Sequence, residues 1–143
     1  MSTKGLEVVD TTLQKTHTWL NELMGALHLD DRHQAYLALR AGLHALRDRL
    51  TVEEAAHLGA QLPLLIRGMY YEGWTPRGKP VKWHRDEFLA TISSTCPVCQ
   101  DVAPERVARA VFKVLSRHIS AGEIRDVKQM LPKELRALWP ESS

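Results

Sequence analysis

Apolar residues recur every three or four positions along most of the chain, which is the period of one face of an α-helix. The first predicted helix carries four leucines at this spacing: Leu13, Leu20, Leu23 and Leu27. A possible capping signal, Thr11 followed three residues later by Gln14, predicts where this helix begins. The sequence shows no sustained alternation of apolar and polar residues of the kind found in half-buried strands, so we predict an all-α fold.

Two further segments continue the helical pattern. We predict a second helix from about Asp31 to Leu50, with one apolar face: Tyr36, Leu39, Leu43, Leu46 and Leu50. A third helix starts at Thr51, where Glu54 completes a capping box. It is expected to break or kink at Pro63, because proline lacks the backbone N–H that a helix interior needs. A short helical tail over residues 64–70 follows.

The chain also resembles itself when it is shifted by 69 residues. Residues 19–70 align without a gap on residues 88–139, and apolar positions largely fall on apolar ones. Several positions are identical at this offset, among them two pairs of charged residues: Arg40 with Arg109 and Glu54 with Glu123. The capping box opened by Thr51 recurs at the same offset, opened by Ser120. This repetition indicates two diverged copies of one helical unit.

The second copy is expected to have the same helices as the first. We predict them over residues 83–95, 104–119 and 121–131, and Pro132 opens a last short helix that ends near Trp139. Residues 72–80, between the copies, are rich in glycine and proline and predict a loop.

The predicted architecture is a compact helical bundle made of two tandem three-helix units. The first unit spans about residues 11–70, the second about 83–139, and a linker over 71–82 joins them. A single unit cannot bury its apolar face alone. We therefore expect the units to pack about a pseudo-twofold axis and to form one domain over residues 1–143.

Composition and charge narrow the class of protein. The 143 residues are 44% hydrophobic and 25% charged, as in an ordinary globular domain. Acidic and basic residues are interleaved, so the net charge of +2 favours a nucleic-acid partner only weakly. The N-terminus lacks the apolar stretch of a secretion signal, and the longest apolar run, residues 62–66, is far shorter than the ~20 residues of a membrane span. Two cysteines do not make a disulfide scaffold, so we expect a cytoplasmic protein without a membrane partner.

Three stretches carry a resemblance to a known family: "ALRAGLHALRDRL" within residues 31–50, "EEAAHLGAQLPLLIRGMYYEGW" at 53–74, and "RAVFKVLSRHISAGEI" with "LPKELRALWP" between 109 and 140. Over roughly residues 6–140 the chain is similar to the bacterial family called domain of unknown function 2267. The resemblance implies a compact helical protein of the bacterial cytosol and supplies no catalytic residue. The chain departs from the family pattern at Ala103, where the family has an Asp before the proline that opens the next helix.

The motif C-P-V-C, with Cys96 and Cys99, is the one short motif that suggests chemistry. Two thiolates at this spacing supply half of a tetrahedral zinc site, and such pairs also act in redox chemistry. Zinc needs two further ligands, for which His84, His118 or a second copy of the chain are candidates. Free thiols in a surface turn are the simpler interpretation. We expect no resident cofactor unless Cys96 and Cys99 hold zinc.

The repeated charged residues form a second group of candidates. Arg40 and Arg109 stand at equivalent positions on helices expected to lie near the pseudo-twofold axis, and Glu54 and Glu123 are equivalent as well. Reciprocal pairing of the arginines with the glutamates would make a structural buried ion pair. Surface positions for these side chains, or an anion site made by both arginines, are the alternatives.

The linker and the start of the second unit combine basic and aromatic residues: Trp74, Arg77, Lys79, Lys82, Trp83 and Arg85. Basic side chains beside exposed rings hold phosphates and stack on bases. Tryptophans that flank glycine and proline turns also fold back onto neighbouring helices. These six residues are therefore our candidates for contact with an external partner.

The sequence lacks a nucleophile elbow, a phosphate-binding loop, a dinucleotide-binding turn and a helical pair of metal-binding histidines, so we do not expect an enzyme. The leading hypothesis is a non-enzymatic helical interaction module that self-associates or binds a protein partner through apolar and aromatic surface near the linker. One alternative is a small metal- or redox-responsive accessory protein that uses Cys96 and Cys99. Another is an anion or nucleic-acid binder that uses the linker. The identity of any small-molecule ligand is open.

Overall fold

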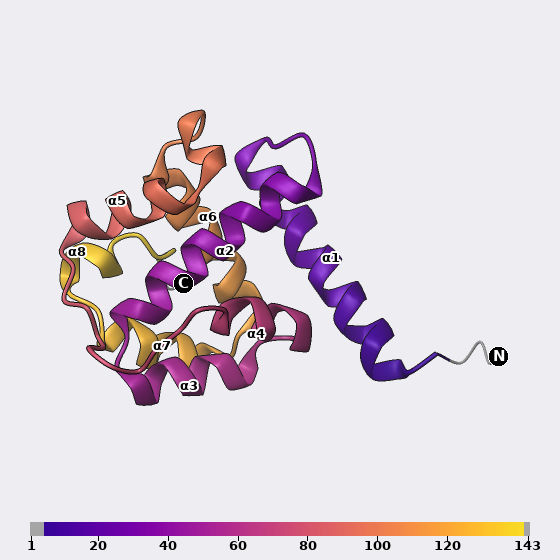
Figure 1. Ribbon diagram of the computed structural model, residues 1–143, viewed down its shortest axis with the longest axis horizontal. Helices are drawn as coiled ribbons and strands as arrows, with labels where there is room; N and C mark the ends of the chain where they lie inside the picture. Colours follow the sequence, from indigo (N-terminus) through magenta and orange to yellow (C-terminus); the bar gives the residue numbers. More distant parts are fainter. Residues whose placement is uncertain (1–4, 142–143) are drawn as a thin grey trace.

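The computed structural model describes residues 5–141, and this part of the chain forms an all-α bundle of eight α-helices and one short 3-10 helix, without strands (Figure 1). Along the chain the elements are α1 (Glu7–Leu27), α2 (Arg32–Arg49), α3 (Val52–Gln61), α4 (Leu64–Tyr71), α5 (Arg85–Thr95), η1 (Pro97–Gln100), α6 (Pro104–His118), α7 (Ala121–Gln129) and α8 (Lys133–Arg136). None of these helices is both long enough and apolar enough to cross a membrane.

Helices α2 and α6 lie at the centre of the bundle. Both pack against α1 and α5 as well as against each other, α2 also contacts α4, and α6 also contacts α7. Gly42 on α2 faces Val111 on α6 so closely that a Cβ atom added to the glycine would stand 2.8 Å from Val111 Cγ2. Large buried rings surround the centre: Trp19, Tyr70, Phe88 and Phe112. The two helices therefore approach each other to a distance that a larger residue at position 42 would prevent.

The capping residues at the start of α3 and α7 are those that the sequence predicts. Thr51 Oγ1 accepts a hydrogen bond from the Glu54 backbone N–H at 3.1 Å, and Ser120 Oγ accepts one from the Glu123 N–H at 3.2 Å. Each hydroxyl satisfies one of the backbone donors that a helix start leaves open. Ala103, at the start of α6, makes no such bond, because its methyl side chain has no acceptor atom.

Some helix boundaries differ from the prediction. Helix α1 begins at Glu7, so Thr11 lies one turn inside the helix and does not cap it. Acidic residues in the first turn stabilise this earlier start through the partial positive charge of a helix N-terminus. Helix α5 begins at Arg85, and Pro132 precedes α8 as its N-cap. Pro63 separates α3 from α4, as predicted.

Two buried arginines of α2 hold the linker against the bundle. Arg47 Nη1 donates to the carbonyl oxygens of Tyr70 at 2.6 Å and Glu72 at 2.7 Å. Arg49 Nε donates to the carbonyl oxygen of Trp83 at 3.0 Å. Both arginine residues are more than nine-tenths buried. The two ends of the linker are therefore attached to the same helix.

Candidate functional site

The linker tryptophans are half-buried and pack against the core. The ring centroids of Trp74 and Tyr71 are 5.5 Å apart, and the Trp74 indole nitrogen is buried. The Trp83 carbonyl accepts the hydrogen bond from Arg49. Both rings therefore fold back onto the helices, which leaves less of their surface for stacking on a partner.

The basic residues of the same region have different surroundings. Arg77 and Lys82 are exposed, and Lys79 is partly exposed. Arg85 forms an ion pair with Glu105. The structure brings exposed positive charge to the linker but does not place the six candidate residues around one shared cavity among the pockets found in the described residues.

Cys96 and Cys99 lie at the start and in the middle of the η1 turn, both as free thiols. Cys96 is buried rather than at the surface, and Cys99 is half-buried. Burial and the neighbouring Cys96 thiol raise the pKa of Cys99 well above its usual range, which disfavours the thiolate that zinc binding and thiol exchange require. The proposed additional ligands are engaged elsewhere: His84 Nδ1 lies 2.9 Å from Glu134, and His118 Nε2 lies 2.8 Å from Glu22.

The repeated arginines are not paired with the repeated glutamates. Arg40 forms an exposed ion pair with Glu72 at 3.0 Å. Arg109 pairs with Glu105, also at 3.0 Å, and donates to a backbone carbonyl at the end of α8. The hypothesis of reciprocal buried Arg–Glu pairs therefore does not describe this fold, and the two arginines serve separate surface contacts.

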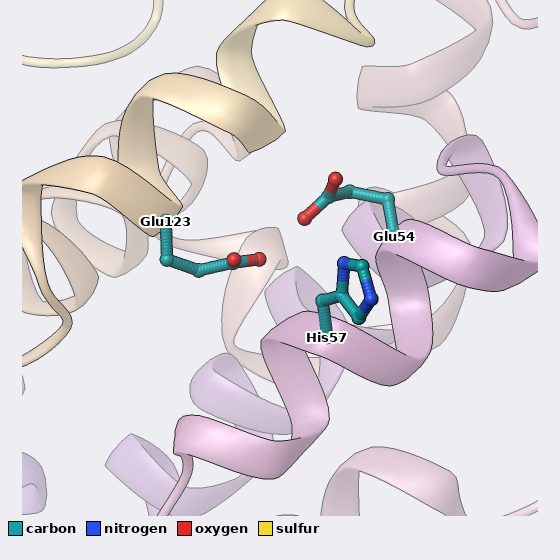
Figure 2. A group of neighbouring side chains, drawn as sticks. All are labelled: Glu54, His57 and Glu123. Atoms are coloured by element: carbon teal, nitrogen blue, oxygen red, sulfur yellow. The ribbon is translucent and has the colours of Figure 1, made fainter.

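Glu54 and Glu123 instead face each other across the contact between α3 and α7, with His57 beside them (Figure 2). One donor atom from each of the three side chains lies within 4.8 Å of the other two. Each glutamate residue is only 7% exposed, whereas His57 is exposed. No donor reaches the buried Oε2 atom of either glutamate within the described residues. The arrangement combines two buried carboxylates with an accessible imidazole.

Local sequence explains why these three side chains meet. Each glutamate is the third residue of its helix, and the cap hydroxyl of Thr51 or Ser120 binds only its backbone N–H. The carboxyl groups turn toward the other helix, so the side-chain half of the predicted capping boxes is not formed. His57 stands three residues after Glu54 and therefore on the same face of α3.

Sequence reasoning selected both glutamates but missed their mutual contact and the role of His57. The repeat contains a signal that points to His57: Glu54-x-x-His57 in α3 and Glu123-x-x-Asp126 in α7 occupy the same positions, so each glutamate has a second possible metal ligand three residues later. Burial, the hydrogen-bonding contact with Glu54 and the nearby charges of Glu54 and Asp126 raise the pKa of Glu123 well above its usual range. Without a cation, the carboxyl of Glu123 therefore retains its proton to higher pH than an exposed glutamate does.

A second surface feature lies on α1. The buried face of this helix, which contains Trp19, Leu20, Leu23 and Leu27, continues toward the N-terminus as Leu13, Val9 and Leu6, which are 44–70% exposed. The exposed Leu64 and Leu65 at the start of α4 lie near the same end of α1, because the Leu65 N–H donates to Thr12 Oγ1 at 2.8 Å. We call Leu6, Val9, Leu13, Leu64 and Leu65 the apolar face. The sequence predicts an apolar surface near the linker, whereas this one is formed by α1, the residue before it and the start of α4.

Comparison with known proteins places the chain in a family. The sequence profile described as uncharacterized conserved protein (DUF2267) matches residues 16–138, and the chain belongs to this family. The matched range contains Glu54, His57 and Glu123, whereas the exposed part of α1 precedes it. No curated protein matches the chain.

Proposed function

We propose that this member of the DUF2267 family is a non-enzymatic helical interaction module of the bacterial cytoplasm that self-associates through the apolar face. The observation that carries the proposal is the continuation of the core-facing stripe of α1 beyond the core. Residues 16–27 bury this stripe inside the bundle, but residues 6–13 leave it exposed. Contiguous exposed apolar surface on a folded protein marks interaction sites, because water contact with such surface is unfavourable.

The shape of the molecule supports the same function. The N-terminal end of α1 extends beyond the centre of the bundle (Figure 1) and contacts the start of α4, so its remaining surface has room for a second helix. The stripe has the three- and four-residue spacing of helix–helix contacts. The indole rings near the linker are folded onto the core, which favours α1 and α4 over the linker as the contact surface.

We also infer that the bundle consists of two units, about residues 11–70 and 83–139, related by a pseudo-twofold axis. Residues on such an axis contact their own equivalents in the other unit. Two pairs separated by the repeat offset of 69 residues have this property: Gly42 faces Val111, and Glu54 faces Glu123. In addition, α1 packs on α6 as α5 packs on α2. A two-unit bundle of this kind is one domain in which the exposed N-terminal turns of α1 remain available to a partner.

Analytical ultracentrifugation over a range of protein concentrations tests the proposal. We expect the wild-type chain to form a dimer whose fraction rises with concentration. The double variant Val9→Lys, Leu65→Lys places two charges in the apolar face and is expected to be monomeric at the same concentrations, because burying unpaired charges is costly. Val52→Lys, at an exposed apolar position on α3, is the matched control and should dimerise as wild type does.

Circular dichroism should show the same helix content and cooperative unfolding for all three proteins, since every substituted side chain is exposed. A wild-type chain that remains monomeric up to its solubility limit would contradict the proposal. A double variant that dimerises as well as wild type would place the contact on another surface.

A further inference from the structure

We infer that Glu54, His57 and Glu123 form a binding site for a divalent transition-metal cation, such as Zn²⁺, between α3 and α7. This inference goes beyond the proposed interaction function and does not depend on it. It rests on three observations: the closeness of the donor atoms, the absence of protein partners for two buried carboxylate oxygens in the described residues, and the kinds of donor present.

The first observation is geometric. The three donor atoms already lie within 4.8 Å of one another, although they come from two helices that are far apart in the sequence. Ligands at about 2.1 Å from one zinc ion lie about 3–3.5 Å apart, so closure around an ion requires a movement of about 1 Å. Rotation about side-chain bonds supplies this movement, because glutamate has three such bonds and His57 is exposed. The helices themselves do not have to move.

The second observation concerns the buried oxygens. Glu54 and Glu123 are each more than nine-tenths buried, and the Oε2 atom of each lacks a hydrogen-bond donor. Among the described residues, no lysine or arginine forms an ion pair with either carboxylate. Two facing carboxylates without a positive neighbour repel each other when ionised. A cation between them removes the repulsion and satisfies both oxygens.

The third observation is the donor set, which separates a metal site from a shared proton. A proton held between Glu54 and Glu123 would account for two facing carboxyl groups, but it gives no role to the imidazole beside them. His57, which is exposed, adds a nitrogen donor beside the two carboxyl groups (Figure 2). Two carboxylates and one imidazole suit Zn²⁺ and related first-row ions, whereas Ca²⁺ and Mg²⁺ prefer oxygen ligands alone. The accessible side leaves room for water to complete the coordination.

Glu54 and Glu123 stand at equivalent positions of their helices. Both side chains stand in the first turn of their helices, where the helix dipole stabilises negative charge. A bound ion would join α3 to α7 directly. Because the three ligands come together only in the folded chain, the ion would bind the folded state far better than the unfolded state and would raise the melting temperature.

The experiment uses the full chain, freed of metal with a chelator that is then removed, and Zn²⁺ alone as the probe. Isothermal titration calorimetry should give one zinc ion per chain, and the melting temperature should rise as Zn²⁺ is added. His57→Ala should weaken zinc binding by at least about tenfold, because even substitutions of residues that only support a metal ligand weaken binding by about 10–100-fold. Its fold should be retained because the residue is exposed. Glu123→Gln should also weaken binding.

Two control variants identify other zinc sites. His17→Ala removes an exposed histidine from α1, and Cys99→Ser removes one thiol of the C-P-V-C motif. Both should bind zinc as wild type does. Zinc binding that is absent from wild type, equal in wild type and His57→Ala, or lost only in Cys99→Ser would overturn the inference. With Co²⁺ as a second probe, an absorption band from thiolate-to-metal charge transfer would assign the ion to the cysteines and overturn it as well.

Discussion

Glu123 is a buried carboxyl group that faces the buried Glu54, and no lysine or arginine among the described residues forms an ion pair with either side chain. The protonation of Glu123 is therefore part of the folding equilibrium. Burial and the facing carboxyl raise the pKa of Glu123 in the folded state. In the unfolded chain the same group titrates at its ordinary pKa of 4.5. Between these two pKa values the folded state binds more protons than the unfolded state. The free energy of unfolding therefore falls as pH rises through this interval.

This linkage predicts the effect of Glu123→Gln in metal-free protein. The amide cannot ionise, so the variant should be more stable than wild type at neutral pH by about 1–2 kcal/mol, since one unit of pKa shift corresponds to about 1.4 kcal/mol. The difference should shrink toward zero below the ordinary pKa of a glutamate. Urea unfolding at a series of pH values in the presence of a chelator measures it.

Glu53→Gln is the control for this experiment, because Glu53 is exposed in the same turn of α3. Its stability should follow the pH dependence of wild type. If the curves of wild type and Glu123→Gln run parallel from acidic to neutral pH, the folded state does not hold the extra proton on Glu123.

At the scale of the element, the helices follow from the sequence where local signals decide and not where tertiary contacts decide. Thr51 and Pro63 delimit α3 because a cap and a missing N–H act within one turn. The predicted cap of α1 is misplaced by five residues, since Thr11 resembles a cap but Leu6 precedes the helix without a side-chain bond. The η1 turn around Cys96 was expected at the surface. Periodicity does not reveal that a short turn is covered by other helices.

The packing of α2 on α6 gives a prediction for one glycine. In Gly42→Ala the new Cβ would lie 2.8 Å from Val111 Cγ2, so one of the two helices must shift. We expect a net loss of about 1 kcal/mol or more in the free energy of unfolding, despite the better helix propensity of alanine. Chemical denaturation measures this loss. The second substitution Val111→Ala should partly restore stability in Gly42→Ala by removing the clash.

Gly68 provides the matched control. It also lies within a helix, but a Cβ atom added there meets nothing within 4 Å. Gly68→Ala should therefore leave stability unchanged or raise it by up to about 1 kcal/mol, because alanine restricts the unfolded chain. An equal effect of the two substitutions would show that the close contact with Val111 does not constrain position 42.

At the scale of the molecule, the sequence predicted an all-α bundle, and the contacts that hold its parts together were largely missed. The offset of 69 residues identified Glu54 and Glu123 as equivalent, but it did not show that they would touch each other, because a repeat does not specify how its copies pack. Arg47 was not selected, since charged residues are usually exposed and nothing in its neighbours marks it as buried. Composition also grouped the basic residues of the linker region, although the structure gives them different surroundings: Arg77 is exposed, whereas Arg85 forms an ion pair with Glu105.

At this scale we predict the loss of stability when the side-chain donors of Arg47 are removed. Arg47→Met keeps the length of the side chain but removes the donors to the carbonyl oxygens of Tyr70 and Glu72. Leaving buried acceptors unpaired should lower the free energy of unfolding by about 2–3 kcal/mol, measured by urea denaturation. Arg40→Met is the control. It breaks only the exposed ion pair with Glu72 and should change stability little. Equal losses in the two variants would contradict a structural role for Arg47.

Arg47 and Arg49 hold the linker region through its main-chain carbonyl oxygens, at Tyr70, Glu72 and Trp83. Every amino acid carries this group, so these attachments do not depend on which side chains stand at the three positions, although the Trp74 ring and the Glu72 carboxylate add side-chain contacts of their own. Between the attachment points, the exposed side chains of Thr75 and Arg77 are therefore free to change in evolution without loosening these contacts. Their positions form the natural place for engineers to insert a peptide tag or a fluorescent label.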